Sequence, residues 1–131
     1  MKKVLLIGIF LSVGALGEKL PYSPDFDKCI DKSGGNTALM RECSTQEYNR
    51  LDKMLNANYR KAMRALDKKL QAKLRNAQRL WLKYRDAKCD LYYSLTGGTL
   101  DLLAGDSCLL DMTARKVKEL EELASMAELS R

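Results

Sequence analysis

No glycine or proline interrupts the chain between Ala38 and Leu95, and this limits the possible folds more than any other feature. Apolar residues recur through this run at helical spacing, so the whole run is predicted to be helical. A single helix of that length would extend about 85 Å, which a chain of this size cannot cover with its own side chains. We therefore predict a helical hairpin that breaks at Asp67-Lys68-Lys69, with Asp67 capping the second helix.

Two apolar stripes define the inward faces of this hairpin. The first helix is expected to begin near Asn36 or Thr37, and its stripe contains Tyr48, Leu51, Leu55, Tyr59, Ala62 and Leu66. The second stripe contains Leu74, Ala77, Tyr84 and Trp81, the only tryptophan. At helical spacing Arg85 can lay its guanidinium on the Trp81 indole, an interaction that contributes about 0.5–2 kcal/mol.

The remaining segments complete an all-α prediction. Residues 18–36 form a lead-in in which Pro21 and Pro24 precede a short helix over Asp25–Lys32. The hairpin is expected to end at Thr96-Gly97-Gly98-Thr99, and the loop that follows closes at Gly105-Asp106-Ser107. A last helix runs from about Cys108 and frays after Met126. Its inward residues are expected to be Leu109, Thr113, Val117, Leu120 and Ala124. The predicted fold is a small three-helix bundle, a helical hairpin plus a C-terminal helix, with a helical domain over residues 37–128.

The first residues have the pattern of an export signal. Lys2 and Lys3 form a basic start, Val4 to Ala15 is apolar, and Ala15-Leu16-Gly17 is a small-x-small cleavage site. The apolar run is short for a membrane span, and no cysteine follows it to carry a lipid anchor. We expect residues 1–17 to be a cleaved signal peptide and the mature protein to be periplasmic or secreted, without a stable membrane anchor.

Export gives the cysteines a structural meaning. Four cysteines in a small exported chain indicate two disulfides, made by Cys29, Cys43, Cys89 and Cys108. Three pairings are possible, and the two local ones, Cys29–Cys43 and Cys89–Cys108, require the least chain folding. Each would contribute about 3 kcal/mol by constraining the unfolded chain. No pair has C-x-x-C spacing, which argues against a thiol–disulfide oxidoreductase.

The sequence offers no assembly of catalytic or metal-binding groups. Histidine is absent, so a zinc site of the usual kind and a histidine-activated nucleophile are both excluded. Asp52 is the one candidate catalytic carboxylate, and glycosidase chemistry would need a second carboxyl about 5–9.5 Å away, which no spacing supplies. We predict a non-enzymatic protein with no cofactor and no metal. Six residues are instead expected to form a structural polar network between the two helices of the hairpin: Asp52, Asn56, Tyr59, Gln78, Trp81 and Arg85.

The ordered set of residues resembles the LprI-like lysozyme inhibitor domain. The motifs are Cys29, Met40-x-Glu42-Cys43, Glu47-Tyr48, Asp52-x-x-Leu55-Asn56-x-x-Tyr59, Gln78-Arg79-x-Trp81-x-x-x-Arg85-Asp86-x-x-Cys89, Gly97-Gly98, Cys108 and Thr113. They extend over most of the chain beyond the signal, although Lys116 stands where the family pattern usually has arginine. The resemblance implies an exported helical domain that inhibits lysozyme and is not an enzyme.

The loop from Thr96 to Ser107 is the candidate binding element. It is rich in glycine, lies between Cys89 and Cys108, and carries two acids. Lysozymes are commonly cationic, so a tethered acidic loop could present Thr96, Thr99, Asp101 and Asp106 to the enzyme. The competing interpretation is structural: the glycines only turn the chain, and Asp106 or Ser107 caps the last helix.

Charge supports a second hypothesis. Between Arg50 and Lys88 there are 13 Lys and Arg against 3 acids, whereas residues 101–131 have 4 basic against 7 acidic side chains. The basic hairpin could bind anionic envelope material, although the stacking pattern of nucleic-acid binders is absent, so no nucleic acid is expected. The expected partner is therefore a lysozyme or another envelope protein, with the anionic material as the alternative.

Overall fold

The computed structural model describes residues 19–130, so the predicted signal peptide lies outside the described residues. Four helices and no strand occur within that range: α1 (Pro24–Lys32), α2 (Thr37–Ala65), α3 (Lys68–Tyr93) and α4 (Leu100–Leu129). The all-α fold of three long helices and a short N-terminal helix is confirmed.

Side-chain caps set the helix boundaries in the hairpin. Asn36 Oδ1 accepts the Leu39 amide at 3.0 Å and begins α2, and Asp67 Oδ1 accepts the Leu70 amide at 2.9 Å and begins α3. The predicted break at Asp67 is therefore confirmed. Gln71 Nε2 then donates to the backbone oxygens of Met63 and Leu66, at 2.8 and 3.1 Å, so carbonyls at the end of α2 are satisfied across the turn.

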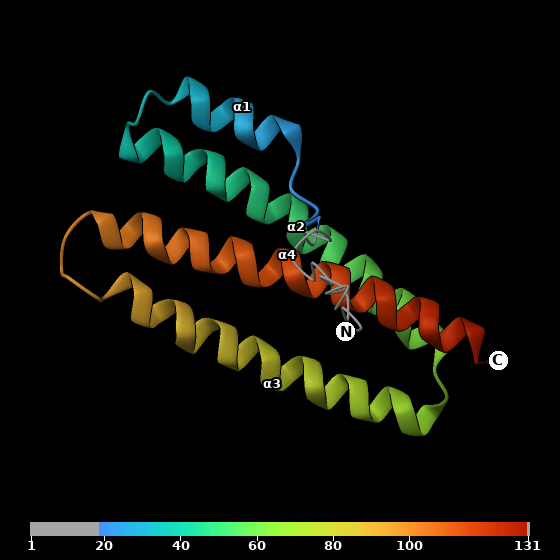
Figure 1. The fold of residues 1–131 in the computed structure, drawn as a ribbon. Coiled ribbons are helices and arrows are strands. Elements are labelled where there is room, and N and C mark those ends of the chain that lie inside the picture. Colours follow the sequence, from blue (N-terminus) through green and yellow to red (C-terminus); the bar gives the residue numbers. More distant parts are fainter. Residues whose placement is uncertain (1–18, 131) are drawn as a thin grey trace, which may run out of the picture.

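The helices are not arranged as a simple hairpin with a third helix laid on it. Figure 1 shows α4 between α2 and α3, while α1 lies on the far side of α2. The core follows α4 in two clusters of buried residues. One contains Leu51, Leu110 and Ala114, and the other contains Leu55, Val117 and Leu120. Trp81 and Leu74 of α3 pack on the second cluster, so α4 is the helix that joins α2 to α3.

Both disulfides join helices that are neighbours in sequence. Cys29 in α1 is bonded to Cys43 in α2, and Cys89 in α3 is bonded to Cys108 in α4. Of the three possible pairings, the structure has the two local ones. Because Cys43 lies near the start of α2 and Cys89 near the end of α3, both disulfides sit at the end of the bundle opposite the Leu66–Asp67 turn.

Three details of the sequence prediction were wrong. The last helix begins at Leu100 rather than near Cys108, so most of the predicted loop is the first part of α4, and the helix continues past Met126. Ala77 and Tyr84 are exposed, because the buried side of α3 follows Leu74, Trp81, Arg85 and Cys89 instead. On α4, Leu110 is buried where Leu109 was expected, and Leu109 is half-buried.

Candidate functional site

The connection between α3 and α4 is a short exposed loop at the end of the bundle that carries the disulfides. It runs from Ser94 to Thr99 and turns at Gly97, whose φ of 78° lies in the region that glycine adopts without strain. The side chains at its two ends protrude: Leu95 is 56% exposed and Leu100 is 70% exposed. The loop is the part of the predicted binding element that remains outside regular helix.

Asp101 holds this loop in place from the first turn of α4. Its carboxylate accepts the Thr96 amide at 2.9 Å, the Thr96 hydroxyl at 2.7 Å and the Gly97 amide at 2.8 Å. These hydrogen bonds, those from Thr96 foremost, lower the pKa of Asp101 below its ordinary value. Asp101 is only 3% exposed. The structure therefore places this predicted binding residue under the loop, where its carboxylate orders the backbone.

Asp106 is also engaged inside the molecule. Its carboxylate accepts Arg41 Nε of α2 at 2.9 Å and the Tyr93 hydroxyl of α3 at 2.5 Å. Burial and the hydrogen bond to Asp106 raise the pKa of Tyr93 to about 12, so the phenol stays a donor. Asp106 thus joins three helices directly beneath the loop. Ser107 is exposed within α4, so neither residue caps the start of the helix as the structural interpretation supposed.

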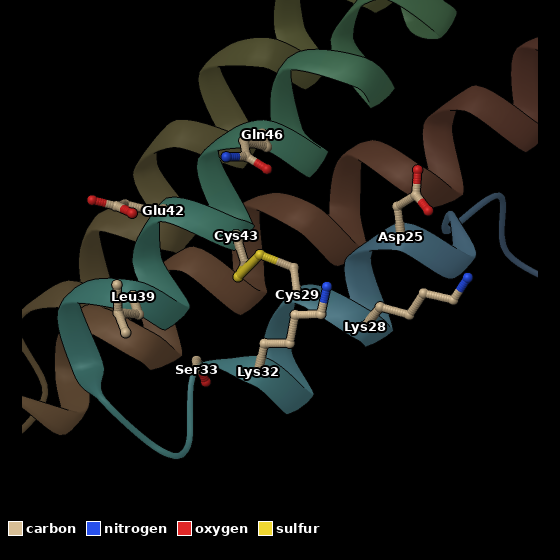
Figure 2. A pocket seen from close by; sticks show the side chains of 9 residues that line it. All are labelled: Asp25, Lys28, Cys29, Lys32, Ser33, Leu39, Glu42, Cys43 and Gln46. Atoms are coloured by element: carbon tan, nitrogen blue, oxygen red, sulfur yellow. A yellow bond between two sulfur atoms is a disulfide. The ribbon is translucent and has the colours of Figure 1, made fainter.

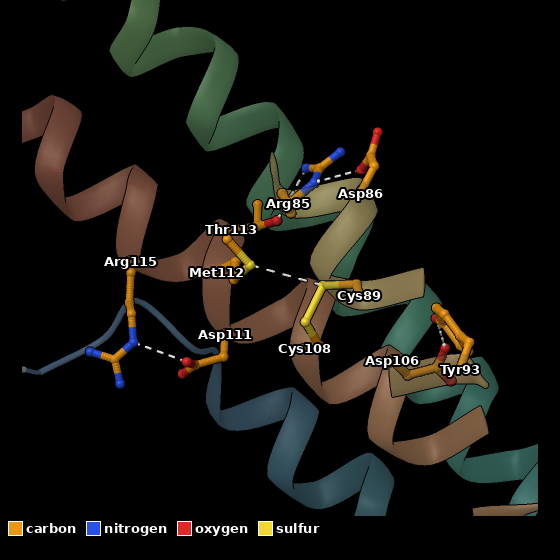
Figure 3. Close-up of a disulfide and its surroundings, with 10 residues drawn as sticks. All are labelled: Arg85, Asp86, Cys89, Tyr93, Asp106, Cys108, Asp111, Met112, Thr113 and Arg115. Atoms are coloured by element: carbon orange, nitrogen blue, oxygen red, sulfur yellow. Dashed lines mark hydrogen bonds and ion pairs between the residues drawn. A yellow bond between two sulfur atoms is a disulfide. The ribbon is translucent and has the colours of Figure 1, made fainter. Parts of the chain in front are cut away.

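A glycine explains how Tyr93 reaches Asp106. A Cβ atom on Gly105 would lie 2.2 Å from Cδ1 of Tyr93, so the ring rests directly against the backbone of α4. In sequence this glycine resembles a loop signal, but in the structure it is a buried helical position that permits a close approach. One turn away, the Cys89–Cys108 disulfide fixes α3 to α4 (Figure 3). The two helices that flank the loop are therefore held together by the disulfide and by the Tyr93–Asp106 hydrogen bond.

Arg85 and Trp81 meet as their spacing predicted. The Arg85 guanidinium lies 5.2 Å from the Trp81 ring centroid and 5.7 Å from that of Tyr48 in α2. Its remaining donors reach Asp86 Oδ1 at 3.0 Å and the buried Thr113 hydroxyl at 3.3 Å (Figure 3). Although it is charged, the side chain is buried. Sequence reasoning missed the Tyr48 and Thr113 contacts, because they come from helices far away in the chain.

The rest of the predicted polar network does not assemble. Neither Asp52 nor Asn56 forms a hydrogen bond to Gln78 or Arg85, and Asn56 is exposed. The reason is that the inner face of α2 packs mainly on α4, and the α2 side chain that reaches Arg85 is Tyr48. Tyr59 packs on the second core cluster instead, and Gln78 is half-buried.

Two contacts that the sequence analysis did not predict join α4 to α2 and to α3 instead. Asn58, rather than Asn56, crosses to α4, where its Nδ2 donates to the Val117 carbonyl at 2.9 Å. Lys116 Nζ lies 5.2 Å from the Trp81 centroid, so the tryptophan has cations from both α3 and α4 near its ring. The departure from the family pattern at position 116 therefore keeps the positive charge beside the indole.

Glu47 fixes the lead-in segment to the bundle. This buried carboxylate accepts the Ser23 amide at 2.9 Å and the Ser23 hydroxyl at 2.8 Å, and it pairs with Arg50. Burial tends to raise the pKa of Glu47, but the hydrogen bonds from Arg50 and Ser23 outweigh burial and lower it. The Arg50 guanidinium also donates to the Pro21 carbonyl at 2.5 Å. Sequence reasoning missed this role of Glu47, because Ser23 lies 24 residues earlier in the chain.

A groove lies between α1 and α2 beside the Cys29–Cys43 disulfide. It has a volume of about 400 Å³, and the Cys29–Cys43 bond forms part of its wall (Figure 2). Lys28 and Lys32 line it from α1, and Glu42 and Leu39 line it from α2. Because both signs of charge line the groove, it does not select a charged ligand class.

Neither a metal site nor a membrane-spanning helix is found in residues 19–130. No group of three or more His, Cys, Asp and Glu side chains is placed there to hold a metal ion. No helix in the same range is long and apolar enough to cross a membrane.

Comparison with known proteins gives a family for this arrangement. A family model described as lysozyme inhibitor LprI matches residues 29–120, which include all four helices in whole or in part. An uncharacterized protein of Rhizobium meliloti (strain 1021) is 33% identical over 119 residues, covering 80% of this chain and 82% of that protein. No solved structure matches.

Proposed function

The chain belongs to the LprI family of lysozyme inhibitors, and from that premise we propose that it inhibits a lysozyme by presenting the α3–α4 loop to the enzyme. The observation that carries this proposal is the exposed loop whose backbone is held by Asp101. An inhibitor that is rigid before binding loses little conformational entropy when it binds, so an ordered exposed loop is suited to this task.

The charge distribution supports contact through the loop end. No Lys or Arg occurs from Cys89 to Ala114, which includes the end of α3, the loop and the first half of α4, and this segment carries four acids. The opposite end of the bundle, around the Leu66–Asp67 turn, has exposed Lys61, Lys68, Lys69, Lys73 and Arg75. A cationic enzyme would therefore be steered toward the loop and away from the turn.

The loop also offers contacts that suit the cleft of a lysozyme. The Thr99 hydroxyl makes no capping hydrogen bond at the start of α4, so it is available to a partner. Lysozyme chemistry uses two carboxyl groups in its cleft, which accept hydrogen bonds from hydroxyl donors. Leu95 and Leu100 would fill apolar parts of the same cleft. In this proposal Thr96 and Thr99 belong to the contact surface, whereas Asp101 and Asp106 position the loop.

The location follows from the same features. Two disulfides in a small domain need an oxidising compartment, so we place the mature protein in the periplasm or outside the cell, after cleavage of residues 1–17. A family of inhibitors acts by binding, and we therefore propose that this chain has no enzymatic activity of its own.

The test is a titration of lysozyme activity with purified mature protein. Lysis of bacterial cell walls by chicken-type and other lysozymes would be followed at increasing inhibitor concentration. We expect saturable inhibition of at least one lysozyme, which weakens as salt screens the charges. Inhibition of none of them would overturn the proposal.

The alternative function, binding of anionic envelope material through the basic hairpin, gives a different result in a parallel experiment. It requires tight binding to a polyanion with a steep loss of affinity as salt is added. The exposed cations around the Leu66–Asp67 turn are the observation that favours it. Polyanion binding without lysozyme inhibition would favour this alternative over the inhibitor.

A further inference from the structure

The helix α3 has a second apolar face besides the one that packs on α4. Four of its residues recur every seven positions, and two more lie three positions after a member of that series: Leu70, Ala77, Tyr84 and Leu91, with Leu80 and Ala87. We call these six residues the α3 seam. All six are exposed, and Leu80, Tyr84 and Leu91 are 57%, 60% and 61% exposed. Apolar residues at alternating spacings of three and four are the pattern by which helices pair in coiled coils.

The α3 seam lies to one side of the face of α3 that packs on α4. With 3.6 residues per turn, the seam lies about a quarter turn around α3 from the residues that face α4, such as Leu74 and Trp81. Figure 1 shows α3 at the outer edge of the molecule, with α4 as its neighbour on one side. No described segment covers the seam, and an exposed apolar stripe of this length is uncommon on a monomer.

We propose that the α3 seam is the surface through which two copies of this chain associate, with the two α3 helices antiparallel. In the pairing that the seam favours, Leu80 of one copy lies opposite Leu91 of the second copy. Tyr84 then lies opposite Ala87 of the second copy, so a large side chain meets a small one. Two-fold symmetry repeats both contacts, as in most homodimers.

Charges beside the seam select the antiparallel arrangement. Lys83 and Asp90 are exposed along one border of the seam, seven residues apart. In the antiparallel pairing Lys83 lies near Asp90 of the second copy, and symmetry makes this contact twice. A parallel pairing would instead place Lys73 against Lys73 and Lys83 near Lys88 of the second copy. Each exposed pair contributes little alone. However, the pairs are attractive in the antiparallel arrangement and repulsive in the parallel one, and this difference decides the orientation.

The size of the seam sets the expected strength. In the antiparallel pairing the side chains of Leu80, Tyr84, Ala87 and Leu91 meet their counterparts, whereas Leu70 lies opposite a position beyond the end of the second α3. These contacts bury less area than a typical permanent dimer, so we expect a monomer–dimer equilibrium that depends on concentration. This inference stands on the geometry of α3 and does not depend on lysozyme inhibition.

The experiment is sedimentation equilibrium of the mature protein over a concentration series, with two single variants and their mixture. The parent protein should shift from monomer to dimer mass as concentration rises. Leu80→Lys and Leu91→Glu should each weaken association by at least about tenfold, because each puts a charge opposite an apolar residue. An equimolar mixture of the two variants should associate again, since the introduced lysine then faces the introduced glutamate. Leu39→Lys, on the exposed face of α2, should associate like the parent.

Each outcome decides the proposal. A parent protein that stays monomeric throughout overturns it, and so do single variants that remain as dimeric as the parent, because another surface would then hold the dimer. A mixture that associates no better than either variant overturns the antiparallel pairing. All variants change exposed residues, and unchanged far-ultraviolet circular dichroism confirms that they are folded.

Discussion

The Asp101 carboxylate accepts the Thr96 hydroxyl at 2.7 Å and so ties the first turn of α4 back onto the loop that precedes it. The same carboxylate accepts the backbone amides of Thr96 and Gly97, so three donors of one short loop converge on a single acid. A loop held in this way keeps one conformation without a partner. This relationship underlies the proposal that the loop is ready to bind.

Asp101→Asn should loosen the loop and weaken inhibition. The amide keeps one acceptor oxygen, but its NH2 group cannot accept a hydrogen bond, so the amide cannot accept all three donors from Thr96 and Gly97 as the carboxylate does. We expect faster hydrogen exchange at the Thr96 and Gly97 amides and inhibition weakened by about tenfold. Glu121→Gln, an exposed acid in the second half of α4 and outside the acidic loop end, is the control and should change neither quantity. Unchanged exchange in the Asp101 variant would show that the carboxylate does not order the loop.

Gly105→Ala should destabilise the protein even though alanine favours helix. Alanine gains roughly 1 kcal/mol of helix propensity over glycine, but its Cβ would lie 2.2 Å from the Tyr93 ring. Overpacking of this kind costs about 1–3 kcal/mol, so the clash should win and the free energy of unfolding should fall. At Gly98 the nearest atom to an added Cβ is Thr96 Oγ1 at 3.4 Å, so Gly98→Ala should be tolerated. Urea unfolding of both variants measures the contrast.

Arg85→Lys should cost stability although it conserves the charge. A lysine ammonium cannot lie flat between the Trp81 and Tyr48 rings and still reach Thr113, as the planar guanidinium does. We expect the free energy of unfolding to fall by about 1–2 kcal/mol. Arg79→Lys, on the exposed side of the same helix, should change it by less than about 0.5 kcal/mol. Equal effects of the two substitutions would contradict this account of Arg85.

The stabilisation that Glu47 gives by holding the lead-in segment should be lost at acid pH. Because its pKa is lower in the folded protein than in the unfolded chain, the stabilisation is fully present above the unfolded value of about 4.3. The stabilisation is lost as pH falls through the lower folded value. In Glu47→Gln the free energy of unfolding should be smaller at neutral pH and should depend less on pH below about 4. Glu42→Gln, an exposed carboxylate on the same helix, should keep the pH dependence of the parent.

The parts of the structure that were predicted depend on residues close in sequence. Asp67 caps α3 three residues before its donor, and Arg85 meets Trp81 four residues away, so both contacts follow from helical spacing. Local disulfide pairing was the least costly of three options, and the structure has it. Such contacts are fixed by the geometry of one helix or one short loop.

The parts that were missed depend on where α4 lies. Gly105 resembled a loop residue because only the position of Tyr93 shows that it permits a close approach. The Asp52–Asn56 network failed because the inner face of α2 packs mainly on α4, and it is Tyr48 of α2, not Asp52 or Asn56, that reaches Arg85 of α3. Glu47 and Ser23 are 24 residues apart, and nothing in their local pattern indicates that they meet. Long-range placement decides these contacts, and a single sequence does not reveal it.

Two equally exposed leucines, one inside and one outside the proposed contact surface for lysozyme, provide the most direct test. Leu95 in the α3–α4 loop and Leu80 in the middle of α3 are 56% and 57% exposed, so Leu95→Lys and Leu80→Lys change charge and exposed area equally. The inhibition constant against a susceptible lysozyme should rise by at least about tenfold for Leu95→Lys and stay within about twofold of the parent for Leu80→Lys. Equal inhibition by the two variants would contradict the claim that the loop contacts the enzyme.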